Sequence, residues 1–345
     1  MTTPDFSNKT LYGTDTKELR SIWAGWLIVF LFPSILGNIT ILLASLKYRA
    51  IKLHRVVVMF IEHIAMLDFI LALTCLIPKV VSLLVNRWVF GEALCYAVVF
   101  ITYYGHCTNL MYICTFTTCK WLILTFPLRS KFWFRKQYHT PVCFAIWVLA
   151  ATFPIAFLII DKSDISFDYR TYLCAYRYTS KKWDLWIIIL SVILGFLPMT
   201  ILLTMTTLLT CYLIRAKKSA ERTSGSFRWQ GLITVLLTAA LYMISYLPFA
   251  SYVVAATLMK QKRADVTTTP GYILYYRISK ETMWCSSTYN IFIYAFTVKS
   301  FRDFLRGKVT ERLSRVSLSG TILGLSQPSE LSPSSNKKQS TSTTI

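Results

Sequence analysis

Charged residues are scarce in this chain, and acidic residues are the scarcest. Only 15% of its 345 residues are charged, compared with about 25% in an average soluble domain. The 16 aspartates and glutamates are outnumbered by 37 lysines and arginines, while 54% of all residues are hydrophobic. This composition excludes an ordinary soluble domain and indicates a protein that crosses a membrane several times.

Patterns typical of metal sites, secretion and catalysis are also missing. The nine cysteines form no Cys-x-x-Cys pair and no cysteine–histidine spacing suited to zinc. Most of them lie in apolar runs, where a free thiol acts as a small hydrophobe, and only Cys95 and Cys174 fall at loop positions. The first 21 residues are polar, so we expect no cleavable signal peptide. No catalytic constellation stands out, so we do not expect an enzyme.

Seven apolar stretches are long enough to cross a bilayer, which takes about 20 residues in a helix. Each is expected to be helical, because open strands would leave backbone groups unpaired in lipid. We therefore predict an all-α membrane protein with a seven-transmembrane helix bundle over residues 22–298. The stretches are residues 22–46, 56–84, 94–124, 141–160, 184–214, 230–259 and 275–298.

The distribution of basic residues orients the bundle. If residues 1–21 are extracellular, the inner segments carry 22 lysines and arginines and the outer segments carry 14. This excess agrees with the positive-inside rule. The basic character then serves orientation and attraction to anionic membrane lipid, and we expect no nucleic-acid partner.

The two ends of the chain carry short recognition patterns. Asn8-Lys9-Thr10 is a glycosylation sequon in the outer segment. Residues 308–345 are rich in serine and threonine and poor in apolar residues, which predicts a disordered cytoplasmic tail. Phosphorylation there would create negative charge that arrestins read, although ordinary disordered composition explains these residues equally well. Thr343–Ile345 match the terminal pattern that PDZ domains bind, a pattern that also arises by chance.

Short motifs occur inside the predicted spans in a fixed order. Each is weak alone, but the ordered set over residues 22–306 resembles the rhodopsin-like family of G-protein-coupled receptors. The motifs are Gly37-Asn38, Ala65-Met66-Leu67-Asp68, Cys95, Cys119-Lys120-Trp121, Trp147, Pro198, Tyr246-Leu247-Pro248, Asn290-Ile291-Phe292-Ile293-Tyr294 and Phe301–Leu305.

This resemblance implies a cell-surface receptor in the plasma membrane. Such a receptor binds an extracellular ligand and passes the signal to a heterotrimeric G protein. The resemblance also implies a short amphipathic eighth helix at residues 299–307 and a disulfide between Cys95 and Cys174.

In the outer half of the bundle, the resemblance implies a ligand pocket. The positive charges of Lys79 and Lys280 in this pocket would need compensation within the bundle. A ligand with an acidic group could supply it. Alternatively, both lysines reach the outer rim and pair with Glu281 or Glu92, and His106 is a core residue. The outer-loop aspartates, including Asp168, could bind a cationic peptide or form a solvated face. The pocket residues are Lys79, Thr102, Tyr103, His106, Tyr246, Phe249, Lys280 and Trp284.

Near the bilayer midplane, the resemblance implies a sodium site at Asp68. Asn38, Asn109, Ser286 and Asn290 are the matching polar positions, and oxygen ligands suit a hard cation. The alternative is that Asp68 is hydrogen-bonded to the amides or protonated, with no ion. We expect no other cofactor.

At the inner face, Lys120, Leu128 and Tyr294 match positions that contact or switch the G protein. Lys120 keeps the positive charge of the family's arginine but loses its planar fork of donors. Cys119 removes the restraining carboxylate, and Arg228 stands where the sixth span usually offers an acid. Either basal activity is raised or coupling is weakened, unless Lys120 merely extends to the interface.

Two other functions remain open at this stage. The replacement of the family's proline by Ile291 and of its tryptophan by Tyr246 favours an atypical receptor that binds ligand but couples weakly or not at all. A transporter or channel would need a continuous polar path, and only the Asp68 group and the outer lysines are available for one. No internal repeat supports that alternative.

Overall fold

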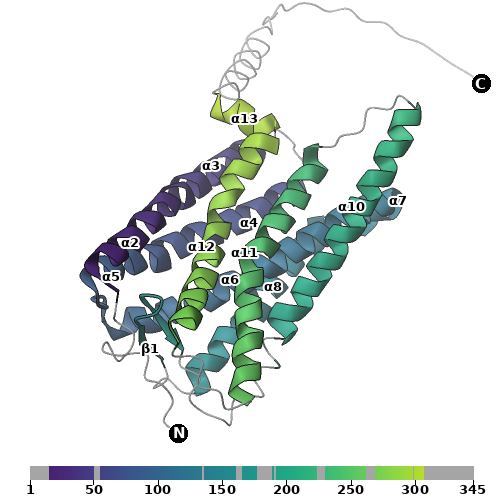
Figure 1. Cartoon of the computed structure of the whole chain (residues 1–345). Helices are drawn as coiled ribbons and strands as arrows, with labels where there is room; N and C mark the ends of the chain where they lie inside the picture. Colours follow the sequence, from purple (N-terminus) through teal and green to yellow (C-terminus); the bar gives the residue numbers. More distant parts are fainter. Residues whose placement is uncertain are drawn as a thin grey trace, which may run out of the picture. The chain divides into compact units, whose positions relative to one another are not determined.

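Long helices make up most of the described chain, as a computed structural model shows (Figure 1). The residues it describes are 15–49, 55–133, 136–160, 165–176, 189, 192–223, 230–261, 269–297 and 299–306. Met1–Phe301 form one compact unit and Arg302–Ile345 form a second. The predicted tail, its terminal motif, Asn8 and Arg228 all lie outside the described residues.

All seven predicted spans contain α-helix. Three of them also contain a short π-helical segment, labelled η. The first two spans are α2 (Lys17–Phe32), η1 (Pro33–Gly37) and α3 (Asn38–Arg49), then α4 (Arg55–Leu71), η2 (Ala72–Leu76) and α5 (Ile77–Val85). The third and fourth are α6 (Gly91–Thr125) and α8 (Lys136–Ile160), joined by α7 (Pro127–Trp133). The remaining helices are η5 (Val192–Phe196) with α10 (Leu197–Thr223), α11 (Gln230–Gln261), α12 (Pro270–Thr297) and α13 (Lys299–Leu305).

Local signals explain where the first spans begin and end. Thr16 caps α2, because its side-chain oxygen accepts a hydrogen bond from the Leu19 N–H at 3.3 Å. The helix therefore starts at Lys17, a few residues before the apolar run. Asn86 ends α5 in the left-handed conformation with φ 56°, which asparagine adopts more easily than most residues.

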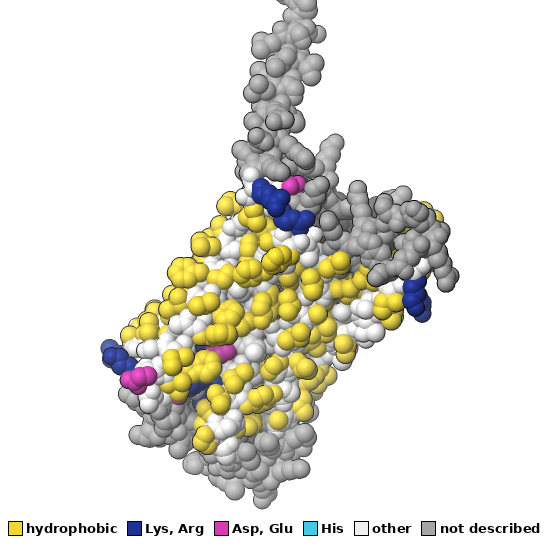
Figure 2. Space-filling view, turned by 45° about the horizontal axis from the view of Figure 1, so that its top comes forward, with side chains coloured by type: hydrophobic (Ala, Val, Ile, Leu, Met, Phe, Trp, Pro, Cys, Tyr) yellow, Lys and Arg dark blue, Asp and Glu magenta, His cyan; other side chains and the backbone are white. Residues whose placement is uncertain are grey.

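Four described stretches have both the length and the hydropathy of a membrane span: Lys17–Leu46, Val58–Val85, Val192–Ala216 and Ile233–Ala255. Helices α6 and α12, with 35 and 28 residues, are also long enough, at about 1.5 Å per residue. They contain more polar residues than the four stretches do. Figure 2 shows hydrophobic side chains over most of the visible bundle surface, as expected for contact with lipid.

The interior of the bundle contains two main hydrophobic clusters. One surrounds Tyr112 and includes Phe60 and Leu202, all almost fully buried. The other contains Leu76, Val98, Tyr172 and Trp284 near the outer end. Between the first and seventh spans the packing is especially close, since a Cβ added to Gly37 would lie 2.9 Å from the Cβ of Ile291.

A β-hairpin in the 161–183 outer loop was not predicted from the sequence. Strands β1 (Ile165–Asp168) and β2 (Leu173–Tyr176) pair antiparallel, with Phe167 opposite Cys174. The turn between them closes when the Asp168 carbonyl accepts hydrogen bonds from Thr171 N–H and Tyr172 N–H, and Tyr172 has φ 54°. Figure 1 shows the hairpin near the first turns of α12, at the opposite end of the bundle from the last turns of that helix.

Candidate functional site

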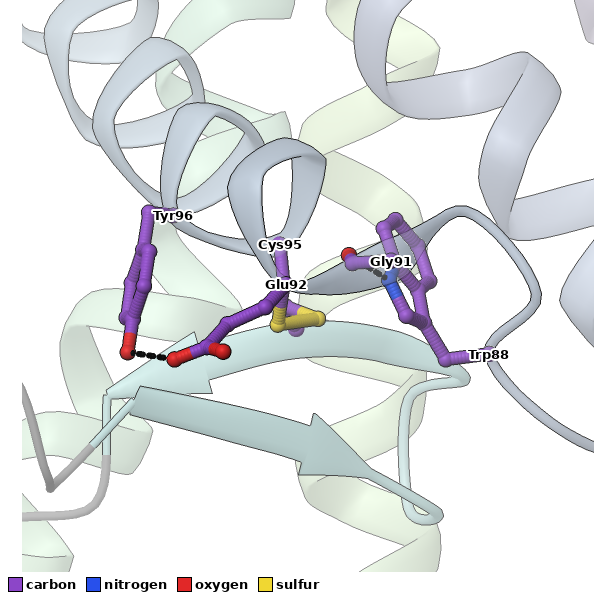
Figure 3. The surroundings of a disulfide bond; sticks show 6 residues. Trp88, Gly91, Glu92, Cys95 and Tyr96 are labelled. Atoms are coloured by element: carbon purple, nitrogen blue, oxygen red, sulfur yellow. Dashed lines mark hydrogen bonds between the residues drawn. A yellow bond between two sulfur atoms is a disulfide. The ribbon is translucent and has the colours of Figure 1, made fainter.

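A disulfide attaches the hairpin to the start of α6. Cys95 in the second turn of α6 is bonded to Cys174 on β2, with 5.4 Å between their Cα atoms. Figure 3 shows the cysteine facing the strand, with Glu92 extending toward Tyr96 on the same helix. The Tyr96 hydroxyl donates to Glu92 at 2.5 Å, and among the described residues no ion pair joins Glu92 to Lys79 or Lys280. The predicted disulfide is therefore present in the structure.

Next to the disulfide, a buried ion pair stabilises the hairpin turn. Arg170 contacts both carboxylate oxygens of Asp168, with Nη2–Oδ2 at 2.9 Å and Nε–Oδ1 at 3.0 Å. Burial lowers the pKa of Arg170, but the Asp168 carboxylate together with Tyr276 and Tyr252 raises it by more, so the pKa rises overall. The sequence suggested that Asp168 forms a solvated face or binds a cationic peptide. Both interpretations are wrong, because Asp168 is 2% exposed and already paired.

A second buried ion pair joins the N-terminal segment, the hairpin and α12. Arg277 on α12 donates from Nε to the Arg170 carbonyl at 2.7 Å, and its Nη1 lies 2.6 Å from Asp15 Oδ2. The Tyr172 hydroxyl donates to the same Asp15 oxygen at 3.2 Å. Burial, then the Asp15 carboxylate, raises the pKa of Tyr172. We call Asp15, Asp168, Arg170, Tyr172 and Arg277 the outer clamp.

Beneath the hairpin lies a pocket with about 440 Å³ of empty space, including the solvent at its mouth. The hairpin forms its roof, α6 and α12 form two of its walls, and Lys79 of α5 also reaches it. Six of the eight predicted ligand residues line it. The other two contact the lining, because the Tyr246 hydroxyl bonds His106 Nδ1 and the Phe249 ring lies under Lys280. The lining residues are Lys79, Val99, Thr102, Tyr103, His106, Thr171, Leu173, Cys174, Ala175, Tyr276, Lys280, Met283 and Trp284.

The two pocket lysines have different partners. Lys79 is 1% exposed, and its Nζ lies 2.5 Å from Glu281 Oε1. The predicted pairing with Glu281 is therefore found for Lys79, but in the bundle interior instead of at the rim. Among the residues that the structure describes, Lys280 has no hydrogen bond or ion pair. Its Nζ lies 4.0 Å from the centroid of the Phe249 ring and 5.6 Å from that of Tyr103.

The floor of the pocket is a contact between α6 and α11. His106 lies edge-on to Trp284, with ring centroids 5.3 Å apart, and is hydrogen-bonded to Tyr246. The Tyr242 hydroxyl donates to the His106 carbonyl at 3.2 Å, and the rings of Tyr242 and Tyr246 stack at 4.1 Å. His106 is thus both a satisfied core residue and part of the pocket surface.

Below this floor, Asp68 is buried between two amides. Asn109 Nδ2 donates to Asp68 Oδ1 at 2.7 Å, and Asn290 Nδ2 donates to Oδ2 at 2.8 Å. Among the described residues, Asn38 forms no hydrogen bond with Asp68. Asn38 instead donates to the carbonyls of Ser34 and Ser287.

Several oxygen atoms around Asp68 are of the kind that binds a small cation. Asp68, Asn109, Ser286 and Asn290 line one small cavity. The Asn109 Oδ1 atom is buried and accepts no hydrogen bond in the described part of the chain. Carboxylate, amide and hydroxyl oxygens are the ligands that a hard cation prefers.

At the inner end of the bundle, the predicted coupling residues differ in exposure. Leu128 on α7 is 81% exposed. Tyr294 is buried and packs against Phe301, with centroids 6.4 Å apart. Lys120 is half-buried, with Nζ 5.7 Å from the centroid of the Phe116 ring. No described acidic residue forms an ion pair with Lys120.

Comparison with known proteins identifies the family. A family model described as 7 transmembrane receptor (rhodopsin family) matches residues 37–294. The chain belongs to this family. It is therefore a multi-pass membrane protein and a G-protein-coupled cell-surface receptor, not an enzyme.

Individual relatives are distant. The neuropeptides B/W receptor type 1 of Bos taurus is 27% identical over 278 residues, covering 78% of this chain and 80% of the relative. A purinoceptor of Rattus norvegicus, purinoceptor 4, is 24% identical over 257 residues, covering 72% and 68%. The probable G-protein coupled receptor 63 of Mus musculus is 21% identical over 345 residues, covering 88% and 78%.

Sequence reasoning did not single out Asp15, Tyr242 or Arg277. For Arg277 a signal was present, since a span that carries Arg277, Lys280 and Glu281 within five residues must compensate several charges. Asp15 gave no such signal, because its partner Tyr172 is 157 residues away in the chain and Arg277 lies further still.

We expect that substituting Asp15 with Asn weakens the outer clamp. Removal of one charge from a buried pair leaves the Arg277 guanidinium without its carboxylate, which costs about 1–3 kcal/mol. The hairpin amides should then exchange hydrogen for deuterium faster, measured by mass spectrometry of the purified receptor. Glu18→Gln, at an exposed site three residues away, is the matched control. Equal hairpin exchange in the two variants would show that the Asp15–Arg277 pair does not hold the hairpin.

Proposed function

We propose that the receptor binds, beneath the β1–β2 hairpin, an extracellular ligand that carries an acidic group. The observation that supports this is the environment of Lys280. Its ammonium borders the pocket over aromatic rings and has no ion-pair partner among the described residues, since the nearby Asp168 is paired with Arg170. An acidic group on the ligand would compensate its charge. In this proposal the N-terminus is extracellular, so that the hairpin faces the outside, in agreement with the basic inner segments.

The names of the relatives leave the ligand class open. One relative is named for neuropeptides and another as a purinoceptor. An acidic peptide end, a phosphate or a carboxylate lipid would each offer Lys280 an anion.

The first test compares the native receptor with Lys280→Gln in cells at matched surface expression. Both are exposed to a panel of nucleotides, carboxylate lipids and peptides with acidic ends, and second-messenger output is recorded. We expect any agonist of the native chain to lose at least about ten-fold in potency on Lys280→Gln, because a charge-assisted hydrogen bond contributes about 1.5–3 kcal/mol. Lys17→Gln, at an exposed position at the start of α2, controls for loss of surface charge. An agonist with unchanged potency on Lys280→Gln would contradict the proposal.

We further propose that Lys120 replaces the family's arginine at the G-protein interface, next to the exposed Leu128. The receptor would then have raised basal activity, because no described acidic residue restrains Lys120. The alternative is an atypical receptor whose coupling is weakened by the loss of the guanidinium fork and by Ile291.

Basal G-protein activation distinguishes these two outcomes. It is measured for the native chain, Lys120→Arg and Lys120→Ala at equal surface expression. We expect a basal signal that Lys120→Ala abolishes. A silent native chain together with an active Lys120→Arg variant would instead establish the weakly coupled receptor.

We also propose that sodium binds at Asp68 with Asn109, Ser286 and Asn290. The unpartnered Asn109 Oδ1 supports this proposal. Replacing choline chloride with sodium chloride should stabilise the purified receptor by about 1.4 kcal/mol when sodium is at about ten times its Kd. Asp68→Asn should remove the difference. Equal unfolding temperatures of the native receptor in the two salts would rule the site out.

Some partners depend on residues outside the described ranges. We propose a glycan at Asn8, arrestin binding to a phosphorylated tail, and a PDZ domain at Thr343–Ile345. Asn8→Gln with an unchanged electrophoretic mobility would exclude the glycan. Truncation after residue 307 with unchanged arrestin and PDZ binding would exclude both tail interactions.

A further inference from the structure

The charges that border the pocket do not balance. Its lining contains two lysines and, among the described residues, no aspartate or glutamate. Glu281 stands outside the lining, with its Oε1 atom 2.5 Å from Lys79 Nζ. Opposite charges this close offset most of each other's effect on a ligand several ångströms away. The Lys79–Glu281 pair therefore leaves the pocket with one net positive charge, on Lys280.

Two arginines near the pocket, among the described residues, are already paired with carboxylates. Arg170 is paired with both oxygens of Asp168, and Arg277 is paired with Asp15. Neither arginine lines the pocket. Among the described residues that line the pocket, Lys280 is therefore the cation that a ligand meets without an ion-pair partner.

The rest of the lining suits an apolar body. Val99, Leu173, Met283 and Trp284 supply hydrophobic surface, and only a few hydroxyl groups accompany them. Phosphate groups are commonly held by several basic side chains, with arginine offering paired donors. A second negative charge would therefore lie here without a partner, at a cost in binding.

We propose that Glu281 determines which ligand charge the pocket accepts. By neutralising Lys79, it makes the pocket accept an apolar molecule with one acidic group, a monocarboxylate, and disfavour an oligophosphate. This inference rests on the proposed role of Lys280 as the anion-binding residue. Glu281 itself does not touch the ligand, so its role is to determine specificity.

A cysteine reporter can measure the charge of the pocket without a known ligand. Met283 lines the pocket one helical turn beyond Lys280, so Met283→Cys places a thiol beside the ammonium. The receptor in lipid nanodiscs is treated with three methanethiosulfonates: the neutral methyl, the anionic sulfonatoethyl and the cationic trimethylammonioethyl reagent. The native chain, without the reporter, gives the background from its own cysteines. The ratio of anionic to cationic rates reports the local potential, and the neutral rate controls for folding and access.

Charge-changing variants are then compared in the Met283→Cys background at mildly acidic pH, where a lysine freed from its carboxylate keeps its proton. Lys280→Gln should lower the ratio on the order of five-fold, and Glu281→Gln should raise it by a similar factor. The double variant Lys79→Met with Glu281→Gln should return the ratio to its starting value. That return would not follow if Glu281 only supported the fold.

The outcomes separate the two proposals. If Glu281→Gln leaves the ratio unchanged while Lys280→Gln lowers it, the anion-binding role of Lys280 stands and the inference about Glu281 is wrong. If Lys280→Gln leaves the ratio unchanged, the proposed anion site is itself wrong. A final arm adds competitors at equal concentration. Phenylbutyrate should slow modification more than adenosine diphosphate does, and the reverse order would overturn the proposal.

Discussion

Compensation of buried charge is the constraint on which this receptor's structure depends. In a medium that solvates ions poorly, each charged side chain must find a partner or an aromatic surface. Asp68 is held by two amides, Lys79 by Glu281, and Arg277 by Asp15. These pairs join segments far apart in the chain, so satisfying the charges also fixes which helices are neighbours. Lys280 lies over aromatic rings and has no ion-pair partner among the described residues, which is why we propose it as the anion-binding residue.

The pocket exists because several attachments hold the hairpin over it. The disulfide fixes β2 to α6, and the outer clamp fixes the hairpin turn to α12 and to the segment before α2. A hairpin of two four-residue strands would be marginal alone. Here its stability comes from a covalent bond on one side and ion pairs on the other. The position of the hairpin over the pocket therefore depends on several segments at the outer end of the bundle.

The sequence predicted the helices, the disulfide and six of the thirteen residues that line the pocket. These follow from apolar runs and from motifs whose order is specific to the family. It could not predict the hairpin, since Ile165–Asp168 and Leu173–Tyr176 are too short for a clear pattern. It also left open whether Lys79 and Lys280 behave alike. Their difference depends on Glu281 lying beside Lys79 in space, 202 residues further along the chain. Long-range pairing of this kind is set by packing and leaves no local signal.

The contact between Gly37 and Ile291 limits which residues can stand where the first and seventh spans meet. Glycine leaves room for the branched side chain of Ile291, and Ile291 in turn fills the space that glycine leaves. Restoring the family's proline at 291 would take away that branched side chain and the backbone N–H together. Any larger residue at 37 would collide with Ile291 as it stands. As long as isoleucine stands at 291, the close approach of the first and seventh spans therefore requires glycine at 37.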